Sequence, residues 1–319
     1  MTNILPNDVY FKIFEFCDLP DLANSRISHG MSIIVNRSAI WKGIAQRING
    51  NFDSVEGAKA FILDLRERVM SIPIGNIRAC NTDSVLKQAP TIDRVKQLQT
   101  YFKARDTLVV WDVLLQELGL TSIWTHAPKT LEDLIEQATH FPKWFSENKF
   151  KLSHLKKLTI HSGHLTSIPS EICELTNLEE LNLCHNQLTA LPSEFGNLKN
   201  LKKLYLTKNL FTSFPMEICQ ISQLELFTCA DNQISSIPSE ICNLKQMKWL
   251  TFCGNKLQAV PGEIFELGQL QSLGLKMNQL QNFPFDKISQ CLPNLTTLEL
   301  YRNEKLKNRP KKIGNCYIN

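Results

Sequence analysis

Apolar and polar residues follow one repeated frame through the second half of the chain. Residues 178–192 show it in full, with leucines at the first, fourth, sixth, eleventh and fourteenth positions, asparagine at the ninth and proline at the fifteenth. The prolines recur at intervals of 23 residues: Pro169, Pro192, Pro215, Pro238, Pro261 and Pro284. A fixed period of this length predicts a solenoid, because one unit cannot bury its apolar face alone and must stack against its neighbours.

Each position of the frame predicts a local structure. The leucines at the first, fourth, sixth and eleventh positions face a shared core, and the fourth to sixth positions form a short parallel strand. The asparagine turns the chain out of the strand, and its amide can satisfy backbone groups of adjacent coils. Proline then starts a short helical turn, and the glutamate two residues later suits its positive end.

This pattern resembles the leucine-rich repeat in its 23-residue form. The resemblance implies an α/β solenoid, a curved horseshoe of about seven repeats over residues 153–319. The terminal repeats depart from the frame, as capping repeats do. Gly163 replaces the asparagine of the first repeat, the sixth repeat has 25 residues, and the seventh shifts by one at Leu306 and Pro310 before the pattern dissolves.

Residues 1–50 predict a separate helical module. Val9, Ile13 and Phe14 recur with helical spacing behind Pro6, and Asp18 or Asp21 can cap a second helix. The segment resembles the F-box, a three-helix module of about 40 residues. The matching positions are Leu5-Pro6, Asp8, Ile13-Phe14, Asp21-Leu22 and Ile40-Trp41. Family members usually carry another tryptophan where this chain has Gly30 to Ile33. The alternative is an ordinary helical cap.

Residues 51–152 predict a helical linker that also caps the open end of the solenoid. An apolar stripe runs through residues 86–118, and Thr130 marks the start of a further helix. A final helix to about Asn148 places Phe141, Trp144 and Phe145 next to the first repeat, where aromatic side chains belong to a core.

Composition narrows the class of protein. The chain has 319 residues, 43% hydrophobic and 21% charged, and a net charge of +4, which disfavours both a disordered tail and a dedicated nucleic-acid binder. No run of 18 apolar residues predicts a membrane span, and residues 1–11 do not resemble a secretory signal. The ten cysteines form no Cys-x-x-Cys pair, which favours a reducing, cytoplasmic compartment.

The sequence predicts neither an enzyme nor a cofactor site. Phosphate-binding glycine loops, nucleophile elbows and His-Glu-x-x-His motifs are missing from it. His154, His161 and His164 have no partner at metal-ligand spacing and are interpreted as a solvated strand edge. Cys229-Ala230-Asp231 resembles the Cys-x-Asp motif of some bacterial ubiquitin ligases, but the sixth position of a repeat points into the core, so the match is interpreted as accidental.

The concave face is the most promising binding surface. We define it as the side chains at the third, fifth, seventh and eighth positions of the repeats, which core packing does not need. Large apolar groups flanked by cations lie there, and such residues often anchor protein interfaces; scattered exposed hydrophobic residues are the alternative. The predicted target-binding residues are Tyr205, Lys208, Leu226, Thr228, Trp249, Thr251, Lys276, Met277, Tyr301 and Arg302.

The two resemblances together imply a substrate-recognition adaptor. F-box proteins dock onto the Skp-family adaptor of a cullin-RING ubiquitin ligase, and their second domain captures a target protein. The residues implied for adaptor binding are Leu5, Pro6, Val9, Ile13, Phe14 and Leu22. The near-identical Pro-Ser-Glu-Ile-Cys repeats also resemble those of intracellular bacteria that secrete F-box mimics into the host cytosol. The alternatives are a leucine-rich-repeat interaction scaffold and an enzyme with a catalytic N-terminal half.

Overall fold

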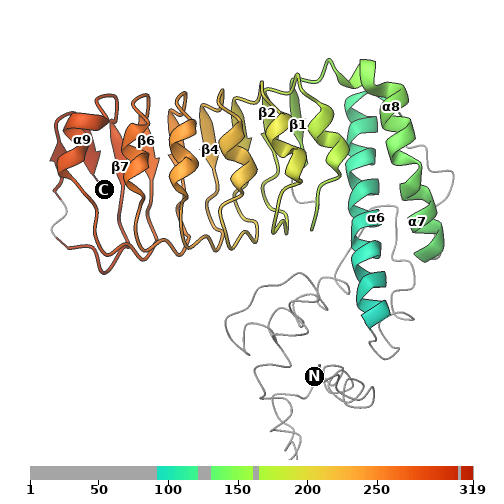
Figure 1. Cartoon of the computed structure of the whole chain (residues 1–319), viewed down its shortest axis with the longest axis horizontal. Helices are drawn as coiled ribbons and strands as arrows, with labels where there is room; N and C mark the ends of the chain where they lie inside the picture. Colours follow the sequence, from blue (N-terminus) through green and yellow to red (C-terminus); the bar gives the residue numbers. More distant parts are fainter. Residues whose placement is uncertain (1–91, 121–130, 161–164, 308–309, 319) are drawn as a thin grey trace, which may run out of the picture. The chain divides into compact units, whose positions relative to one another are not determined.

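The computed structural model describes residues 92–120, 131–160, 165–307 and 310–318 (Figure 1). The chain divides into two compact units, one of Met1–Ala104 with Trp124–Gln137 and the other of Arg105–Ile123 with Ala138–Asn319. The predicted F-box module, residues 1–50, and residues 51–91 of the predicted linker lie outside the described residues, as does Gly163.

The second unit contains one sheet whose strands follow each other in chain order. Seven parallel strands, β1 to β7, pair at a shift of one repeat, for example Leu181 with Leu204 and Leu204 with Phe227. The strands are β1 Lys157–Thr159, β2 Glu180–Asn182, β3 Lys203–Tyr205, β4 Leu226–Thr228, β5 Trp249–Thr251, β6 Ser272–Gly274 and β7 Thr297–Glu299. The predicted solenoid of stacked coils is confirmed.

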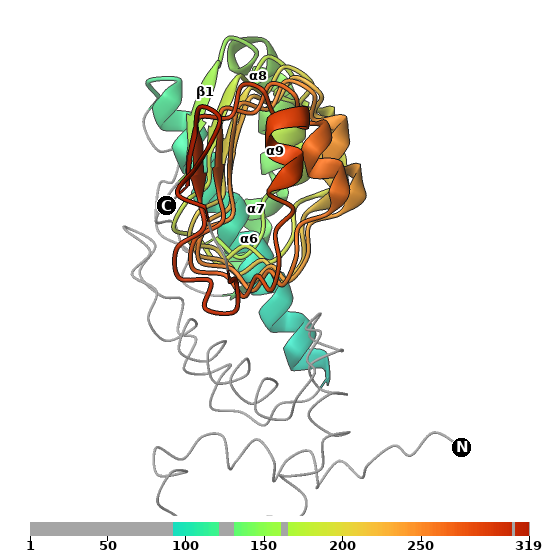
Figure 2. The same ribbon diagram turned by 90° about the vertical axis from the view of Figure 1, so that its left-hand side faces the viewer.

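Short 3-10 turns close each coil on the side opposite the strands (Figure 2). Each begins directly after the repeated proline, which caps the turn rather than occupying its first position. The turns are η1 Ser170–Glu174, η2 Ser193–Asn197, η3 Met216–Gln220, η4 Ser239–Asn243 and η5 Gly262–Glu266. Their isoleucines or phenylalanines are buried and complete the core from that side.

The core follows the predicted positions of the frame. Leu178, Leu181, Leu183 and Leu188 are fully buried, and the equivalent residues of the other described repeats are buried as well, except Leu155 at the start of the first repeat, which is half-buried. Cys229 is 0% exposed, as its position predicted. Phe214, Phe227 and Phe252 pack together in the middle coils with ring centroids 5.7 to 6.0 Å apart. Larger side chains therefore fill the core where leucine is replaced.

A ladder of asparagines joins the coils. The Asn232 amide nitrogen donates to the carbonyl oxygens of Leu206 and Cys229, and its oxygen accepts from the Phe211 nitrogen at 3.0 Å. The same pattern of contacts recurs in the equivalent residues, which are Asn186, Asn209, Asn255, Asn278 and Asn303. Each side chain thus serves backbone groups of neighbouring coils, as predicted.

Helices precede the repeats. They are α6 Ile92–Glu117, α7 Leu131–Thr139 and α8 Phe141–Leu152. The predicted helix start near Thr130 is confirmed, and the final helix runs four residues beyond the expected end at Asn148. A Lys149–Glu174 ion pair of 2.7 Å joins α8 to the first 3-10 turn, so the helix does lie beside the first repeat. Of the described helices, none is sufficiently long and apolar to cross a membrane.

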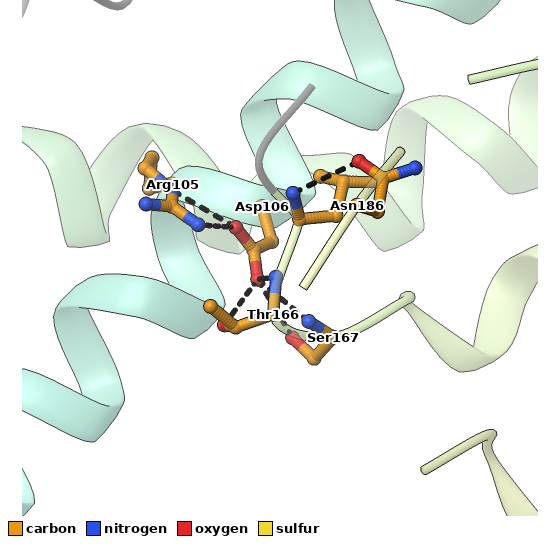
Figure 3. Close-up of polar contacts among 6 residues, drawn as sticks. Arg105, Asp106, Thr166, Ser167 and Asn186 are labelled. Atoms are coloured by element: carbon orange, nitrogen blue, oxygen red, sulfur yellow. Dashed lines mark hydrogen bonds and ion pairs between the residues drawn. The ribbon is translucent and has the colours of Figure 1, made fainter. Parts of the chain in front are cut away.

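Aromatic and polar contacts hold α6 and α8 to the solenoid unit. Trp111 lies 5.5 Å from Phe141 and 5.4 Å from Trp144, measured between ring centroids. The buried Asp106 carboxylate pairs with Arg105 and accepts hydrogen bonds from the backbone nitrogens and hydroxyls of Thr166 and Ser167 at 2.7 to 3.2 Å (Figure 3). The last turns of α6 from Arg105 on therefore cap the first repeat.

Three details differ from the prediction. The strands occupy the third to fifth positions of the frame, one residue earlier than predicted, although the nitrogen of the sixth residue, Leu183, still bonds to the Tyr205 carbonyl of the next coil. In the long sixth repeat, the α-helix α9 Asp286–Cys291 replaces the 3-10 turn, since two extra residues allow an α-helical turn. The C-terminal residues form regular structure, contrary to the prediction. Strands β8 Lys312–Ile313 and β9 Cys316–Ile318 form a hairpin, and β9 extends the sheet beyond β7.

Candidate functional site

The concave face is built from side chains that alternate with the buried ones along each strand. In β3, β4 and β5 the central residue is buried, and the residues on either side of it point away from the core. The parallel register aligns these outward residues in rows. One row runs from Lys203 through Leu226 and Trp249 to Ser272, and the next from Tyr205 through Thr228 to Thr251. The fold therefore brings the predicted residues of these strands together on one surface.

A further row follows the strands, where each coil turns through the left-handed region. His185, Lys208, Asp231, Met277 and Arg302 have φ values of 51° to 57°, and Gly254 occupies the equivalent position with φ 66°. This conformation is unfavourable for most side chains. The following asparagine compensates by bonding the turn to adjacent backbone groups, so the turn holds Lys208, Met277 and Arg302 at fixed points beside the strands.

Large apolar side chains are exposed on this face. Trp249 is 40% exposed, Met277 42% and Tyr301 40%, whereas Tyr205 and Leu226 are half-buried. A side chain on this surface contributes little to the core, and exposed tryptophan, tyrosine and methionine are typical of interface anchors. Their occurrence on adjacent or nearly adjacent coils distinguishes the face from a surface with isolated hydrophobic residues.

Ion pairs neutralise the N-terminal part of the face. The Glu180 carboxylate lies 3.3 Å from the Lys157 ammonium and 3.6 Å from that of Lys203. A second group of ion pairs lies at the preceding residues of the same coils: the Glu179 carboxylate contacts the ammonium groups of Lys156 at 3.2 Å and Lys202 at 2.8 Å. The two lysines lower the pKa of Glu179 through hydrogen bonds. These charges already have partners within the molecule.

The C-terminal part has a different arrangement. The Lys276 ammonium lies 5.4 Å from the Tyr301 ring centroid and 3.5 Å from the Glu299 carboxylate. A hydrogen bond with Tyr301, and then the Glu299 charge, raise the pKa of Lys276. The Arg302 guanidinium contacts the Met277 sulfur at 3.9 Å. Cations here lie against aromatic or sulfur-containing side chains, which orders them for contact with a partner.

The C-terminal hairpin adds residues that the sequence analysis missed. Tyr317 pairs in register with Thr297, which places it in the row of Leu226 and Trp249, and it is 60% exposed. The Lys312 ammonium lies 4.9 Å from its ring centroid. A signal was available in the sequence, because the alternation of Cys316, Tyr317 and Ile318 is that of a strand with its central residue outward.

Clusters of metal-binding side chains and reactive thiols would be the other candidate sites among the described residues. Within the part of the chain that the structure describes, no group of three or more potential metal-binding side chains is found. Burial raises the pKa of the Cys229 thiol and takes that of Cys219 to about 12, so neither thiol is a nucleophile at neutral pH. His154 is exposed beside Phe150, whereas His161 and His164 fall outside the described residues. The six residues implied for adaptor binding, Leu5 to Leu22, fall outside them as well.

Comparison with known families agrees with the repeat geometry. Residues 153–211 match the family described as leucine rich repeat. The described residues from 153 onward form a solenoid of the leucine-rich-repeat type. The match covers the first two repeats and the start of the third, and the same strand register, asparagine contacts and 3-10 turns continue beyond it.

Several solved structures share some likeness with this chain. A leucine-rich-repeat protein of Leptospira interrogans has 35% identity and a TM-score of 0.46, over 50% of this chain and 44% of its own. The functional domain of InlJ from Listeria monocytogenes has 20% identity and a TM-score of 0.41, over 47% and 31%. The plant peptide hormone receptor RGFR1 in complex with RGF2 has 29% identity and a TM-score of 0.41, over 53% and 28%.

The chain thus spans less than half the length of each of these proteins. The search of curated proteins found no match.

Proposed function

We propose that this chain is a non-catalytic protein-interaction module whose concave face holds a partner protein. The observation that carries the proposal is the exposure of Trp249, Met277 and Tyr301 on one face of the leucine-rich-repeat sheet. The core does not need these side chains, and aromatic and methionine side chains presented by a rigid scaffold are typical anchors of protein interfaces. The face would hold its partner without bond making or breaking.

The finer proposal joins this face to the N-terminal module. Residues 1–50 resemble an F-box, so the chain would act as the substrate-recognition adaptor of a Skp–cullin–F-box ubiquitin ligase. Its contribution would be proximity, because holding a target near the ligase raises the effective concentration of that target. The proposed location is the cytosol, and that of a host cell if the chain is a bacterial effector.

Adaptor binding tests the finer proposal directly. Titration of the full chain with the Skp adaptor in a calorimeter should give saturable binding, and Leu5→Ala combined with Pro6→Ala should weaken it at least about tenfold by removing apolar contact area. Met216→Ala, which changes an exposed apolar residue on the 3-10 side, is the matched control and should bind like the wild type. If the wild-type chain gives no binding, the ligase role is excluded and the interaction scaffold remains.

The concave face needs a separate test. Trp249→Ala should remove specific partners recovered by the immobilised chain from cytosol, since loss of a central aromatic anchor typically costs about 2 kcal/mol or more. Phe150→Ala is the control, because Phe150 is a 78% exposed aromatic residue on α8 and not on a strand. Equal yields of the same partners with both variants would contradict capture by the concave face.

A further inference from the structure

The two ends of the concave face differ in how their charges are satisfied. Toward the N-terminus, Lys157 and Lys203 both lie against Glu180. From β5 onward, the described residues of the face include three cations, Lys276, Arg302 and Lys312, and one carboxylate, Glu299. We call this second part, with Trp249, Met277, Tyr301 and Tyr317, the C-terminal patch. It therefore carries an excess of positive charge among apolar anchors.

Each cation of the patch rests against an uncharged side chain, and Lys276 is also paired with the Glu299 carboxylate at 3.5 Å. Lys312 lies over the Tyr317 ring and Lys276 over the Tyr301 ring, at 4.9 Å and 5.4 Å from the centroids. Arg302 rests against the Met277 sulfur. A ring or a thioether positions a cation without neutralising it, so the charges of Arg302 and Lys312 stay available to an incoming carboxylate, whereas Lys276 would share its charge with Glu299. Preordered side chains also lose less conformational entropy when a partner binds.

The dimensions of the patch suit a polypeptide segment. It crosses five strands, β5, β6, β7, β9 and β8, which are neighbours in that order. With strands about 4.8 Å apart, this corresponds to roughly 19 Å, the length of about six residues of extended chain. An extended segment of that length spans the strands and turns that carry the three cations.

We propose that the C-terminal patch recognises an acidic segment of a partner protein, with an apolar side chain of the segment against Trp249 and its carboxylates against Lys276, Arg302 and Lys312. The inference rests on the proposed function and names the chemistry of the partner. Nucleic acid is the less suitable occupant, because Glu299 lies within the patch and the positive charge is small compared with the continuous basic surfaces that bind phosphate backbones.

The test is selection of a displayed library of random 16-residue peptides on the immobilised full chain. Enriched peptides should contain more aspartate and glutamate than the unselected library, together with aromatic or aliphatic residues. Their affinity, measured by fluorescence anisotropy, should fall as NaCl is raised from 50 to 500 mM because salt screens the contacts. Lys276→Gln, Arg302→Gln and Lys312→Gln combined should weaken binding by about tenfold or more.

The control variant also loses three positive charges, but at positions outside the C-terminal patch. Lys199, Lys245 and Lys256 are exposed lysines outside the concave face, and their combined change to glutamine should leave peptide binding unchanged. Circular dichroism and the melting temperature establish that both triple variants remain folded, which separates lost contacts from lost structure.

The outcomes separate the inference from the proposed function. Enriched peptides without acidic residues, or acidic peptides that both triple variants bind equally, would overturn the acidic partner and leave protein binding intact. A failure to enrich any peptide would count against the proposed function too. Tighter binding of a labelled 20-nucleotide single-stranded DNA than of the enriched peptides, lost in the patch variant alone, would assign the patch to nucleic acid and overturn the inference.

Discussion

At the scale of single residues, the asparagine ladder accounts for much of the order of the fold. The coil between strand and 3-10 turn leaves backbone groups inside the molecule that the short strands cannot pair. Asn232 serves such groups on its own coil and on the coil before it, and only 7% of it is exposed. A buried polar group without a partner costs about 1–3 kcal/mol, so one side chain per coil protects several backbone groups from that cost.

Replacing Asn232 by alanine should therefore lower the free energy of unfolding by about 1–3 kcal/mol, because the Phe211 nitrogen loses its acceptor, whereas the Leu206 carbonyl keeps its bond from Asn209. Urea denaturation followed by circular dichroism measures the change. The control is Asn243→Ala, an exposed asparagine in η4, for which we expect less than about 0.5 kcal/mol. Similar losses in the two variants would show that the ladder does not stabilise the coils.

At the scale of elements, α6 illustrates how a helix is fixed to a solenoid. Asp106 has no exposed surface, and one of its oxygens accepts four hydrogen bonds from Thr166 and Ser167 (Figure 3). The backbone nitrogens of that segment belong to the first repeat, which has no preceding coil of its own to pair with. The carboxylate supplies an acceptor for them from α6.

Asp106→Asn should lower the free energy of unfolding of the N-terminal end of the solenoid by about 2–4 kcal/mol. The amide removes the charge that faces Arg105 and replaces one hydrogen-bond acceptor by a donor. Tryptophan fluorescence during urea denaturation is a suitable measurement, because Trp111 and Trp144 pack nearby. Asp112→Asn makes the same chemical change on the same helix at a partly exposed position bonded to Gln116, and it should have little effect. If Asp106→Asn left the midpoint of urea denaturation unchanged, the Asp106 contacts would not stabilise the first repeat.

The sequence predicted the elements whose pattern is periodic and failed where the pattern ends. The repeats, the burial of Cys229 and the outward placement of Trp249 follow from a frame that recurs six times. The Asp106 contact could not be predicted, because it joins residues 60 apart without any local signal. The C-terminal hairpin was missed because its strands are only two and three residues long, and Pro310 suggested a loss of structure.

At the scale of the whole repeat array, stability depends on covering both ends. Each coil of a solenoid contacts only its neighbours, so an uncovered terminal coil exposes leucines and an unpaired strand edge. The hairpin meets both needs at the C-terminal end. Its strand β9 pairs with β7, while Cys316 and Ile318 are buried below the sheet. The short outer strand β8 carries Lys312, and a charged side chain on an edge disfavours further pairing.

Substitutions at two neighbouring residues of β9 can distinguish the role of the hairpin in covering the core from its role in binding a partner. Ile318→Asp should lower stability by about 2–4 kcal/mol, because a carboxylate would be buried where a side chain is now 8% exposed, and the freed edge should promote aggregation. Tyr317→Asp makes the adjacent position acidic on the exposed side and should change stability by less than about 0.5 kcal/mol, while it weakens binding of acidic peptides. Melting temperature, light scattering and peptide anisotropy on the same samples distinguish the effects. If Tyr317→Asp unfolded the chain as readily as Ile318→Asp, the hairpin would serve only as a cap, and its outward surface would have no separate role in binding.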